Sequence, residues 1–404
     1  MADLHLGGWR DLELEKLNLS AFEKALDTCL KEKVDFIVIS GDFFDTSMPP
    51  FDVLDFVTKR LNSVKKSGIP VYTISGSHDH SPSGKTILKV LENAELITNV
   101  ARGEEKDGKL RLLFTADKKT GAKLTGIFGR SGSLDVEFYK NLDRSVEKAA
   151  EKEPGYKIFL FHAGIEEYRP DYLKDVAAMP LSLLPSGFDY YAGGHIHHRS
   201  EQEYGSSTVT GKKGKVIFPG PLFPCNFAEL ERFGHGGFYI VDGGRPRFVE
   251  LKEKEVEVIK VDADNKTAKE VEALLEEKVA SLNKKDCILL IRVSGTLKEG
   301  KPADINFKRL AEEAVANGAA IVRRNTSSLV PKEYEEVKVS ADSIEGLEAR
   351  IIKEHLGQSG MKDEEKLVAR LLKVLDTEKL EGETASAFES RLLKDADVAI
   401  GSKS

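Results

Sequence analysis

Short apolar segments, each ending where polar or glycine residues begin, constrain the fold of this 404-residue chain more than any other feature. Asp35–Ser40, Lys157–Phe161 and Phe188–Ala192 are almost continuously apolar, as parallel strands buried on both faces are. Amphipathic stretches separate these segments, and their periodicity predicts helices, among them one over residues 51–66. This alternation predicts a layered α/β domain that ends near residue 250.

A capping pattern near the N-terminus predicts where the first helix begins. Ser20 is followed three residues later by Glu23, the pairing known as a capping box. Apolar residues at helical spacing follow, from Phe22 to Cys29. We therefore expect a helix that begins at Ser20 and packs this apolar face on the sheet.

The sequence pattern changes near residue 253 and again near residue 340. Residues 253–340 alternate strand and helix patterns with balanced charge, which predicts a small α/β cap domain. Beyond it, only helical periodicity is present, with a wide apolar stripe that includes Leu371 and Leu375. The expected domains are residues 1–252, 253–340 and 341–404.

Composition restricts the class of protein. The net charge of −7 argues mildly against binding nucleic acid through bulk electrostatics alone. Apolar runs stay shorter than the roughly 18 residues of a membrane span, and the first residues lack the pattern of a secretory signal peptide. Cys29, Cys225 and Cys287 are too far apart for a disulfide framework or a zinc knuckle, which favours free thiols in a reducing compartment. We expect a cytoplasmic protein without membrane association.

Histidine and aspartate residues recur where predicted strands end, which is where open α/β sheets build their sites. The motifs are Asp3-Leu-His5, Gly41-Asp42, Gly76-Ser77-His78-Asp79, His162 and Gly194-His195-Ile196-His197. Each motif is weak by itself, since a lone histidine such as His162 is more often packed in a core than bound to a metal. His195 and His197 are stronger, because alternate residues of a strand project to the same side. Together the motifs predict a metal or catalytic site.

The order of these motifs resembles that of the calcineurin-like metallophosphoesterases. More narrowly, three segments resemble the SbcD family, which includes the meiotic-recombination-eleven nuclease of DNA double-strand-break repair: Met1–Gly7, Gly41–Asp45 and Tyr191–His197. Phe218–Pro221 and Gly237–Val241 resemble the end of that family's nuclease domain. The resemblance extends over essentially the whole chain. It implies an α/β fold with a β-sandwich flanked by helices, a small α/β cap domain and a C-terminal helical segment.

The resemblance also implies a two-metal site with a defined set of ligands. The first metal would be bound by Asp3, His5, Asp42 and His197, and the second by Asp42, Ser77, His162 and His195. Asp42 would then bridge two cations that repel each other at about 3.5–4 Å. Mixed nitrogen and oxygen ligands suit Mn, Fe or Zn better than Mg, and the resemblance favours two Mn²⁺.

His78 and Asp79 have separate roles by the same resemblance. His78 occupies the position of a histidine that is not a ligand, where it would stabilise the transition state or protonate the leaving 3′-oxygen. Asp79 would orient the imidazole of His78. Ser77 departs from the family pattern, which has asparagine there, so the second metal would be held loosely or through a water. Only two residues precede Asp3 in this sequence, so we expect the strand that carries it to be truncated, which would leave Asp3 and His5 poorly fixed.

The remaining segments suggest partners. The cap contains four basic residues of interest: Lys308, Arg309, Arg323 and Arg324. They either lie at solvent-exposed ends of helices and strands or, as the resemblance implies, contact DNA phosphates. The C-terminal helices either pack on the protein itself or dock on the coiled coil of an SbcC-type ABC ATPase. We favour docking because the segment is too small for a good core of its own. The resemblance also implies a homodimer, with the helix over 51–66 a candidate contact.

The function that the resemblance implies is a manganese-dependent DNA exonuclease and endonuclease that acts on double-strand ends and single-stranded DNA in break repair. Two alternatives remain open. Another phosphoesterase, such as a nucleotidase, phosphodiesterase or protein phosphatase, would share the metal ligands but would not need the cap and the helical tail. A non-catalytic scaffold of the repair complex would not need two bound Mn²⁺ ions, and Ser77 and the short N-terminus favour it.

Overall fold

The computed structural model describes residues 1–81, 86–130, 132, 134–205, 213–332, 367, 370, 371, 374, 375, 377 and 385–400. The chain divides into two compact units, Met1–Leu329 and Val330–Ser404, which are treated separately. In the second unit, α11 (Ala385–Ile400) is amphipathic and contains Phe388. Most of the predicted segment 341–404 lies outside the described residues, and the predicted domain boundaries near residues 252 and 340 stay predictions.

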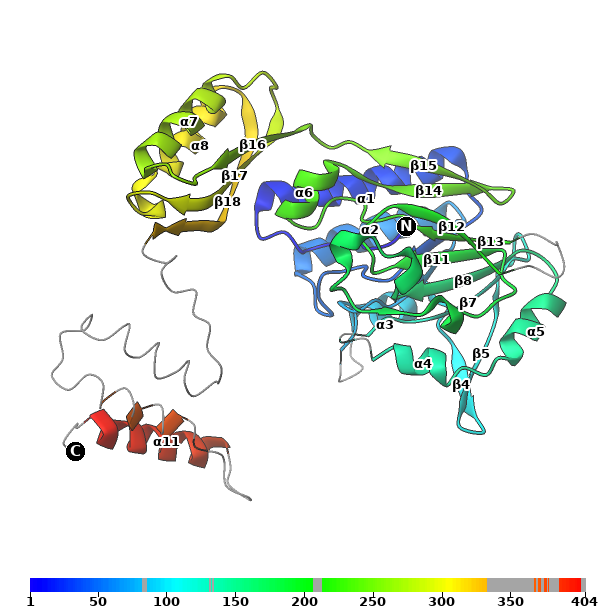
Figure 1. The fold of residues 1–404 in the computed structure, drawn as a ribbon. Helices are drawn as coiled ribbons and strands as arrows, with labels where there is room; N and C mark the ends of the chain where they lie inside the picture. Colours follow the sequence, from blue (N-terminus) through cyan, green and yellow to red (C-terminus); the bar gives the residue numbers. More distant parts are fainter. Residues whose placement is uncertain are drawn as a thin grey trace. The chain divides into compact units, whose positions relative to one another are not determined.

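Three parallel strands form the first sheet, in the order β1-β2-β3, and the helices that precede them in the chain are labelled in Figure 1. The strands are β1 (Ile37–Ser40), β2 (Val71–Ile74) and β3 (Thr98–Asn99), and the helices between and before them are α1 (Leu12–Glu32), α2 (Phe51–Lys66) and α3 (Ile87–Asn93). The predicted helix over 51–66 is therefore confirmed. Phe22, Leu26 and Cys29 of α1 are buried in the core beside this sheet, as their spacing predicted.

A second sheet of six strands, in the order β12-β13-β11-β8-β7-β6, lies against the first. Its strands are β6 (Thr115–Ala116), β7 (Lys123–Ile127), β8 (Lys157–His162), β11 (Tyr190–Gly194), β12 (Ser200–Tyr204) and β13 (Gly214–Phe218). The four central strands are parallel, and the two edge strands are antiparallel to their neighbours. Ile74 of one sheet and Leu160 of the other share an apolar cluster between the layers. The predicted α/β class is confirmed.

Smaller elements complete the first unit. They are β4 (Gly103–Lys106), β5 (Lys109–Leu112), α4 (Val136–Lys140), α5 (Ser145–Lys152), β9 (Gly164–Ile165), β10 (Ala178–Met179), α6 (Phe227–Phe233), β14 (Gly236–Asp242) and β15 (Arg245–Leu251), with 3₁₀ turns at Glu166–Tyr168, Asp171–Leu173, Leu181–Leu183 and Pro302–Asp304. Sequence periodicity did not predict α4, α5 or α6, because five to eight residues give too few turns for a clear amphipathic pattern.

The first helix begins earlier than its capping pattern predicted. Helix α1 starts at Leu12, and the carboxylate of Asp11 accepts hydrogen bonds from the backbone N–H groups of Glu13 and Leu14. Ser20 lies inside the helix, so the prediction that the helix begins there was wrong. Aspartate is as good an N-cap as serine, and the helix is extended to the first residue that can satisfy its free N–H groups.

The cap region forms a three-stranded sheet covered by two helices. The elements are β16 (Val256–Asp262), α7 (Ala268–Ala280), β17 (Cys287–Leu297), α8 (Phe307–Ala316) and β18 (Ala319–Pro331). Thr267 and Glu270 form a capping box at the start of α7. Leu275, Leu289 and Leu310 share a buried cluster that is separate from the core of the two larger sheets.

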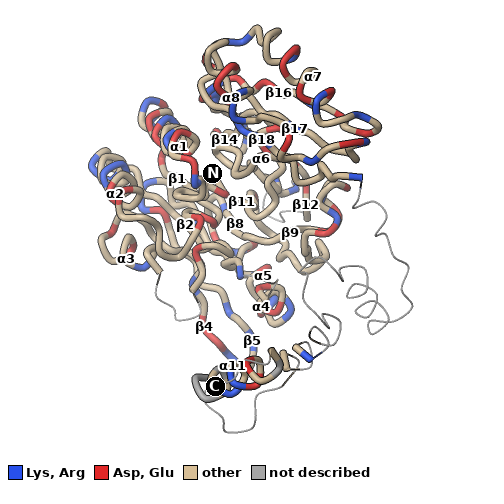
Figure 2. Tube along the Cα trace, turned by 90° about the vertical axis from the view of Figure 1, so that its left-hand side faces the viewer, with Lys and Arg blue, Asp and Glu red and all other residues tan. Residues whose placement is uncertain are grey.

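The basic residues of the cap are largely engaged with neighbouring side chains. The guanidinium of Arg309 forms ion pairs with Glu272, Glu276 and Glu313, and that of Arg323 forms one with Asp11. Figure 2 shows basic and acidic positions interspersed along the trace of α7. These contacts favour the view that Arg309 and Arg323 stabilise the fold. Within the described part of the chain, no helix has both the length and the apolar character needed to cross a membrane.

Candidate two-metal site

Asp3 and His5 lie on an extended segment that runs beside the end of β1. The N–H of Asp3 donates to the carbonyl of Gly41 at 3.1 Å, and the N–H of His5 donates to that of Asp42 at 3.0 Å. The buried amide of Asn18 donates to the carbonyl of His5 at 3.0 Å. The expectation that Asp3 and His5 would be poorly fixed was therefore wrong, because backbone hydrogen bonds and α1 hold them.

Backbone strain is concentrated at the predicted ligands. Asp3, His5, Asp42 and His195 adopt positive φ angles of 52°, 43°, 49° and 83°. This region is uncommon for residues other than glycine, costs about 1–3 kcal/mol for each residue and persists only where the surroundings enforce it. The clustering of four such residues around one point indicates a functional site.

Three glycines let the loops approach each other closely. A Cβ atom on Gly41 would lie 2.3 Å from Nδ1 of His162, and one on Gly76 would lie 2.2 Å from the backbone N of Asp42. A Cβ on Gly194 would lie 2.1 Å from the carbonyl oxygen of Ser40. Real Cβ atoms do not make such contacts, so the site requires glycine at these positions.

Gly76→Ala tests this close packing. We expect it to lower the free energy of unfolding by about 3 kcal/mol or more, because the new methyl group must displace the backbone and carboxylate of Asp42. Bound metal should be lost as well. Gly68→Ala is the control, because its Cβ meets nothing within 4 Å and only the left-handed backbone costs about 1–2 kcal/mol. Urea unfolding and metal analysis measure both effects, and equal losses in the two variants would contradict the packing argument.

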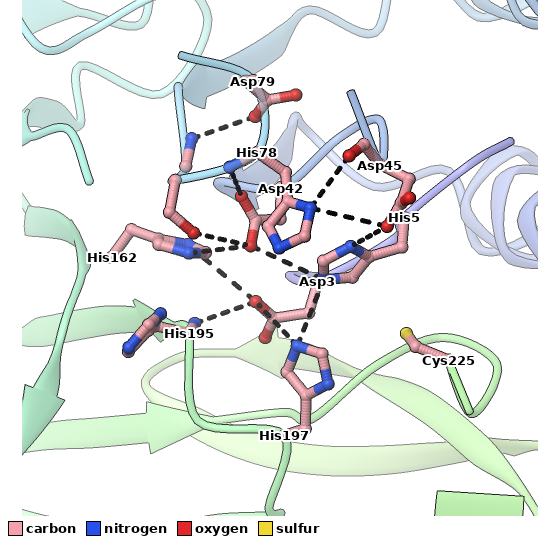
Figure 3. A network of polar contacts seen from close by, with 12 residues as sticks. Asp3, His5, Asp42, Asp45, His78, Asp79, His162, His195, His197 and Cys225 are labelled. Atoms are coloured by element: carbon pink, nitrogen blue, oxygen red, sulfur yellow. Dashed lines mark hydrogen bonds and ion pairs between the residues drawn. The ribbon is translucent and has the colours of Figure 1, made fainter. Parts of the chain in front are cut away.

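Asp42 occupies the centre of the predicted ligands (Figure 3). Its Oδ2 lies 3.1 Å from Nε2 of His162 and 3.5 Å from Nε2 of His5. The hydroxyl of Ser77 donates to the same oxygen at 3.4 Å, and the backbone N–H of His78 donates to Oδ1 at 2.8 Å. Asp42 thus lies between the two ligand groups, as a bridging carboxylate must.

Asp3 and the two neighbouring histidines close the other side of the site. The Oδ1 of Asp3 lies 3.8 Å from Nε2 of His197 and accepts a hydrogen bond of 2.8 Å from the backbone N–H of His195. The same Nε2 of His197 is 3.2 Å from Nε2 of His5. The rings of His162 and His195 lie with their centroids 5.4 Å apart. The structure therefore brings all seven predicted ligands together.

Outer partners orient the imidazole rings. Nδ1 of His162 donates to the carbonyl of Ser40 at 2.8 Å. Nδ1 of His197 lies 2.9 Å from Oε1 of Glu229, and Nδ1 of His5 lies 3.1 Å from Oδ1 of Asp45. Each contact leaves Nε2 pointing into the site, which is how metal-binding histidines are usually held.

Glu229 was missed by the sequence analysis because it lies on the short helix α6, in a stretch that reads as strand-rich. The sequence analysis included Asp45 in the Gly41–Asp45 motif but assigned this residue no role. A carboxylate a few residues after a ligand motif was the signal that could have identified it.

The charges of the site influence one another strongly. Although burial disfavours its charged form, the histidines beside Asp42, above all His162, hold the pKa of this carboxyl well below its usual range. Burial likewise opposes the charge of His162, but Asp42 outweighs it and raises the pKa of the ring to about 9. Burial lowers the pKa of His195 to about 4, so that ring is neutral and able to bind a metal at neutral pH.

The residues fit divalent metal ions. Among the residues that the structure describes, the buried Oδ2 of Asp3 has no hydrogen-bond partner. Buried polar atoms are rarely left unpaired, and a cation would satisfy this oxygen. Three sets of side chains have ligand atoms within 4.8 Å of one another: Asp3, Asp42 and His162; His5, Asp42 and His78; and His5, His197 and Cys225.

The predicted role of Asp79 was wrong. Its carboxylate is buried and accepts hydrogen bonds from the backbone N–H groups of Phe43, Phe44 and Gly76 at 2.9–3.0 Å. It therefore fixes the loops after β1 and β2, and burial raises its pKa to about 6. The imidazole of His78 is oriented by Asp45 instead, whose carbonyl lies 2.8 Å from Nδ1.

A cavity of about 610 Å³ opens beside the site. Ser77, His78, His162 and His195 lie on one part of its wall, and Arg130 lies on another. Half of the side chain of His78 is exposed, so this ring can reach a molecule in the cavity. The cavity therefore gives a substrate access to the second group of ligands.

Comparison with known proteins identifies the class of this site. Residues 1–199 match the family described as calcineurin-like phosphoesterase. The first half of the chain is therefore a calcineurin-like metallophosphoesterase domain, as its motifs predicted.

Several relatives are archaeal proteins named DNA double-strand break repair protein Mre11, which confirms the predicted resemblance to the SbcD and meiotic-recombination-eleven family. The relative from Methanopyrus kandleri is 27% identical over 269 residues, which cover 64% of this chain and 56% of the relative. That from Saccharolobus solfataricus is 29% identical over 245 residues, 59% of this chain and 58% of the relative. The chain thus spans somewhat over half the length of these two relatives. That from Sulfolobus acidocaldarius is 25% identical over 393 residues, 94% of this chain and 96% of the relative.

Proposed function

We propose that this protein is a metal-dependent DNA nuclease that hydrolyses phosphodiester bonds in double-strand-break repair. The observation that carries the proposal is the central position of Asp42, which faces histidines of both ligand groups at 3.1 and 3.5 Å. Relatives named as DNA double-strand break repair proteins supply the substrate class. The experiment below tests both parts.

The ligand assignment follows the two groups around Asp42. We propose Asp3, His5, Asp42 and His197 for the first metal and Asp42, Ser77, His162 and His195 for the second. When bound, two such ions polarise the scissile phosphate and make water a better nucleophile. Asp42 offsets the repulsion between the two cations, and the Nδ1 contacts of the histidines keep their Nε2 atoms aimed inward. Ser77 is the weakest donor, since a neutral hydroxyl stands where the family has an amide.

We propose His78 as the group that protonates the leaving 3′-oxygen. Its ring lies edge-on to His5, with the ring centroids 4.7 Å apart, and 46% of its side chain is exposed. A carbonyl oxygen 2.8 Å from Nδ1 stabilises a proton on that nitrogen, so it is Nε2 of the doubly protonated ring that would donate its proton to the leaving oxygen. Asp45 thereby serves both His5 and His78.

The metal and the partners remain proposals. We propose Mn²⁺, with Fe²⁺ or Zn²⁺ possible. We propose an SbcC-type ABC ATPase that binds the C-terminal helices, of which α11 is described. A homodimer through α2 is supported by Phe51, whose side chain is 88% exposed at the start of that helix. The cytoplasmic location stays a prediction.

Cleavage of end-labelled duplex and single-stranded DNA, with Mn²⁺, with Mg²⁺ and with EDTA, tests the proposed activity. A generic phosphodiester dye is the parallel substrate. We expect DNA cleavage that depends on Mn²⁺ and stops in EDTA. Hydrolysis of the dye without DNA cleavage would favour a general phosphodiesterase or nucleotidase. Inactivity on both substrates, with metal bound, would favour the scaffold.

A further inference from the structure

Cys225 lies beside the proposed first metal position, although the ligand motifs do not include it. Its Sγ is within 4.8 Å of the ligand atoms of both His5 and His197. Figure 3 shows the sulfur directed toward these two rings from the loop that precedes α6. Cys29 and Cys287 are buried in α1 and β17 and belong to the apolar clusters there. The position of Cys225 is therefore specific to the site.

The loop that carries Cys225 is fixed by the residues that orient His197. The backbone N–H of Cys225 donates to Oε2 of Glu229 at 2.8 Å, while Oε1 of that carboxylate lies 2.9 Å from Nδ1 of His197. The indole N–H of Trp9 donates to the carbonyl of Pro224 at 3.0 Å. The thiol contacts the carbonyl of Phe223 at 3.6 Å and also forms a hydrogen bond with the imidazole of His197. The sulfur is thus held against the ring of a proposed ligand of the first metal.

The surroundings of His197 independently indicate a missing cation. Asp3 is fully buried, and its Oδ2 has no hydrogen-bond partner among the described residues. Its Oδ1 lies 3.8 Å from Nε2 of His197, which is itself 3.2 Å from Nε2 of His5. A buried carboxylate oxygen and two facing imidazole nitrogens are donors that a divalent cation would satisfy together.

We propose that Cys225 is a further ligand of the first metal, beside Asp3, His5, Asp42 and His197, and that its sulfur makes this position bind Zn²⁺, Fe²⁺ or Co²⁺ more tightly than Mn²⁺, which still binds there when supplied in excess. The proposal rests on the two-metal site proposed above and names the metal class of one of its two positions. Thiolate ligands favour zinc and iron, whereas Mn²⁺ and Mg²⁺ favour oxygen. As the metal–sulfur bond forms, the S–H bond breaks and its proton passes to solvent, so no oxidant or reductant is needed. The second position has no sulfur and keeps its preference for Mn²⁺.

Titration of the metal-free full chain with Co²⁺ under reducing conditions tests the ligand directly. A sulfur ligand gives a sulfur-to-cobalt charge-transfer band in the near ultraviolet, whatever the activity of the protein. We expect this band in the native protein and in Cys287→Ser, and its absence in Cys225→Ser, while the native number of Co²⁺ ions still binds. In competition experiments, Cys225→Ser should lower Zn²⁺ affinity by about 10–100-fold and leave Mn²⁺ affinity nearly unchanged.

The outcomes separate this proposal from the proposed function. Two bound Co²⁺ ions without the band, or a band that survives in Cys225→Ser, would overturn the role of Cys225 and leave the two-metal site intact. Failure of the folded native protein to bind Co²⁺, Zn²⁺ or Mn²⁺ would overturn both. X-ray absorption of the zinc-loaded protein gives a second measurement. A zinc–sulfur distance of about 2.3 Å supports the ligand, and a shell of nitrogen and oxygen alone contradicts it.

Discussion

Asp42→Asn is expected to reduce phosphodiester hydrolysis by at least about 10²–10³-fold, the loss that follows removal of one charge-stabilising group from an active site. The reason is specific to its position, because Asp42 is the carboxylate that faces both ligand groups, 3.1 Å from Nε2 of His162 and 3.5 Å from Nε2 of His5. A neutral amide has nearly the same shape but cannot offset the repulsion between two cations. The number of bound metal ions should fall from two to one or none.

Metal analysis by mass spectrometry and initial rates on the same samples measure the effect of Asp42→Asn. Asp55→Asn is the control, because its carboxylate is exposed and, within the described part of the chain, pairs with Lys59 alone on α2. The control should keep both the metals and the rate. Two bound metals and a rate within tenfold of the native protein in Asp42→Asn would show that Asp42 does not bridge.

His78→Gln is expected to lower kcat by about 10²–10⁴-fold, the usual contribution of a general acid, with little change in KM. The ring is 46% exposed, and its orienting contact is the carbonyl of Asp45 at 2.8 Å, so its loss should leave the proposed metal ligands in place. The number of bound metal ions should stay at two.

His80→Gln is the matched control for His78→Gln. His80 stands two residues away and stacks on the ring of Phe128, with centroids 6.2 Å apart. Its substitution should change kcat by less than the substitution of His78. A loss of metal from His78→Gln would contradict the assignment and make His78 a ligand, since its ring also lies within 4.8 Å of His5 and Asp42 ligand atoms.

The convergence of the proposed ligands could be predicted from the sequence, because all of them except Asp3 and His5 follow a buried strand or a glycine. Asp42 follows β1, and His162 ends β8. The parallel pairing of β8 with β11 places His162 beside Gly194, next to His195. Strand order cannot be read from spacing, but the carboxyl ends of parallel strands meet at one edge of the sheet whatever their order.

The residues around the ligands could not be predicted in the same way. Glu229 lies on a short helix and Cys225 on the loop before it, about 30 residues after His197. Both approach His197, but no local sequence pattern links them to it. Asp79 was assigned to His78 because the two are adjacent in sequence. Its carboxylate points instead to three backbone N–H groups, since buried donors at the ends of β1 and β2 need an acceptor.

The first helix shows a limit of a different kind. Its apolar face was predicted correctly, and Phe22, Leu26 and Cys29 are buried. The residue at which the helix begins was predicted incorrectly, because both Asp11 and Ser20 are suitable N-caps and only tertiary structure decides between them. Helix α1 is longer than predicted, and Asn18 on the additional turns holds the carbonyl of His5. The error at the helix start therefore concealed one support of the site.

The most direct test of the two-metal account is anomalous X-ray diffraction from crystals of the full chain grown with Mn²⁺. We predict two anomalous peaks about 3.5–4 Å apart on either side of the Asp42 carboxylate. One peak should lie between Asp3, His5 and His197, and the other between His162 and His195. A single peak, or peaks that do not contact Asp42, would contradict the account.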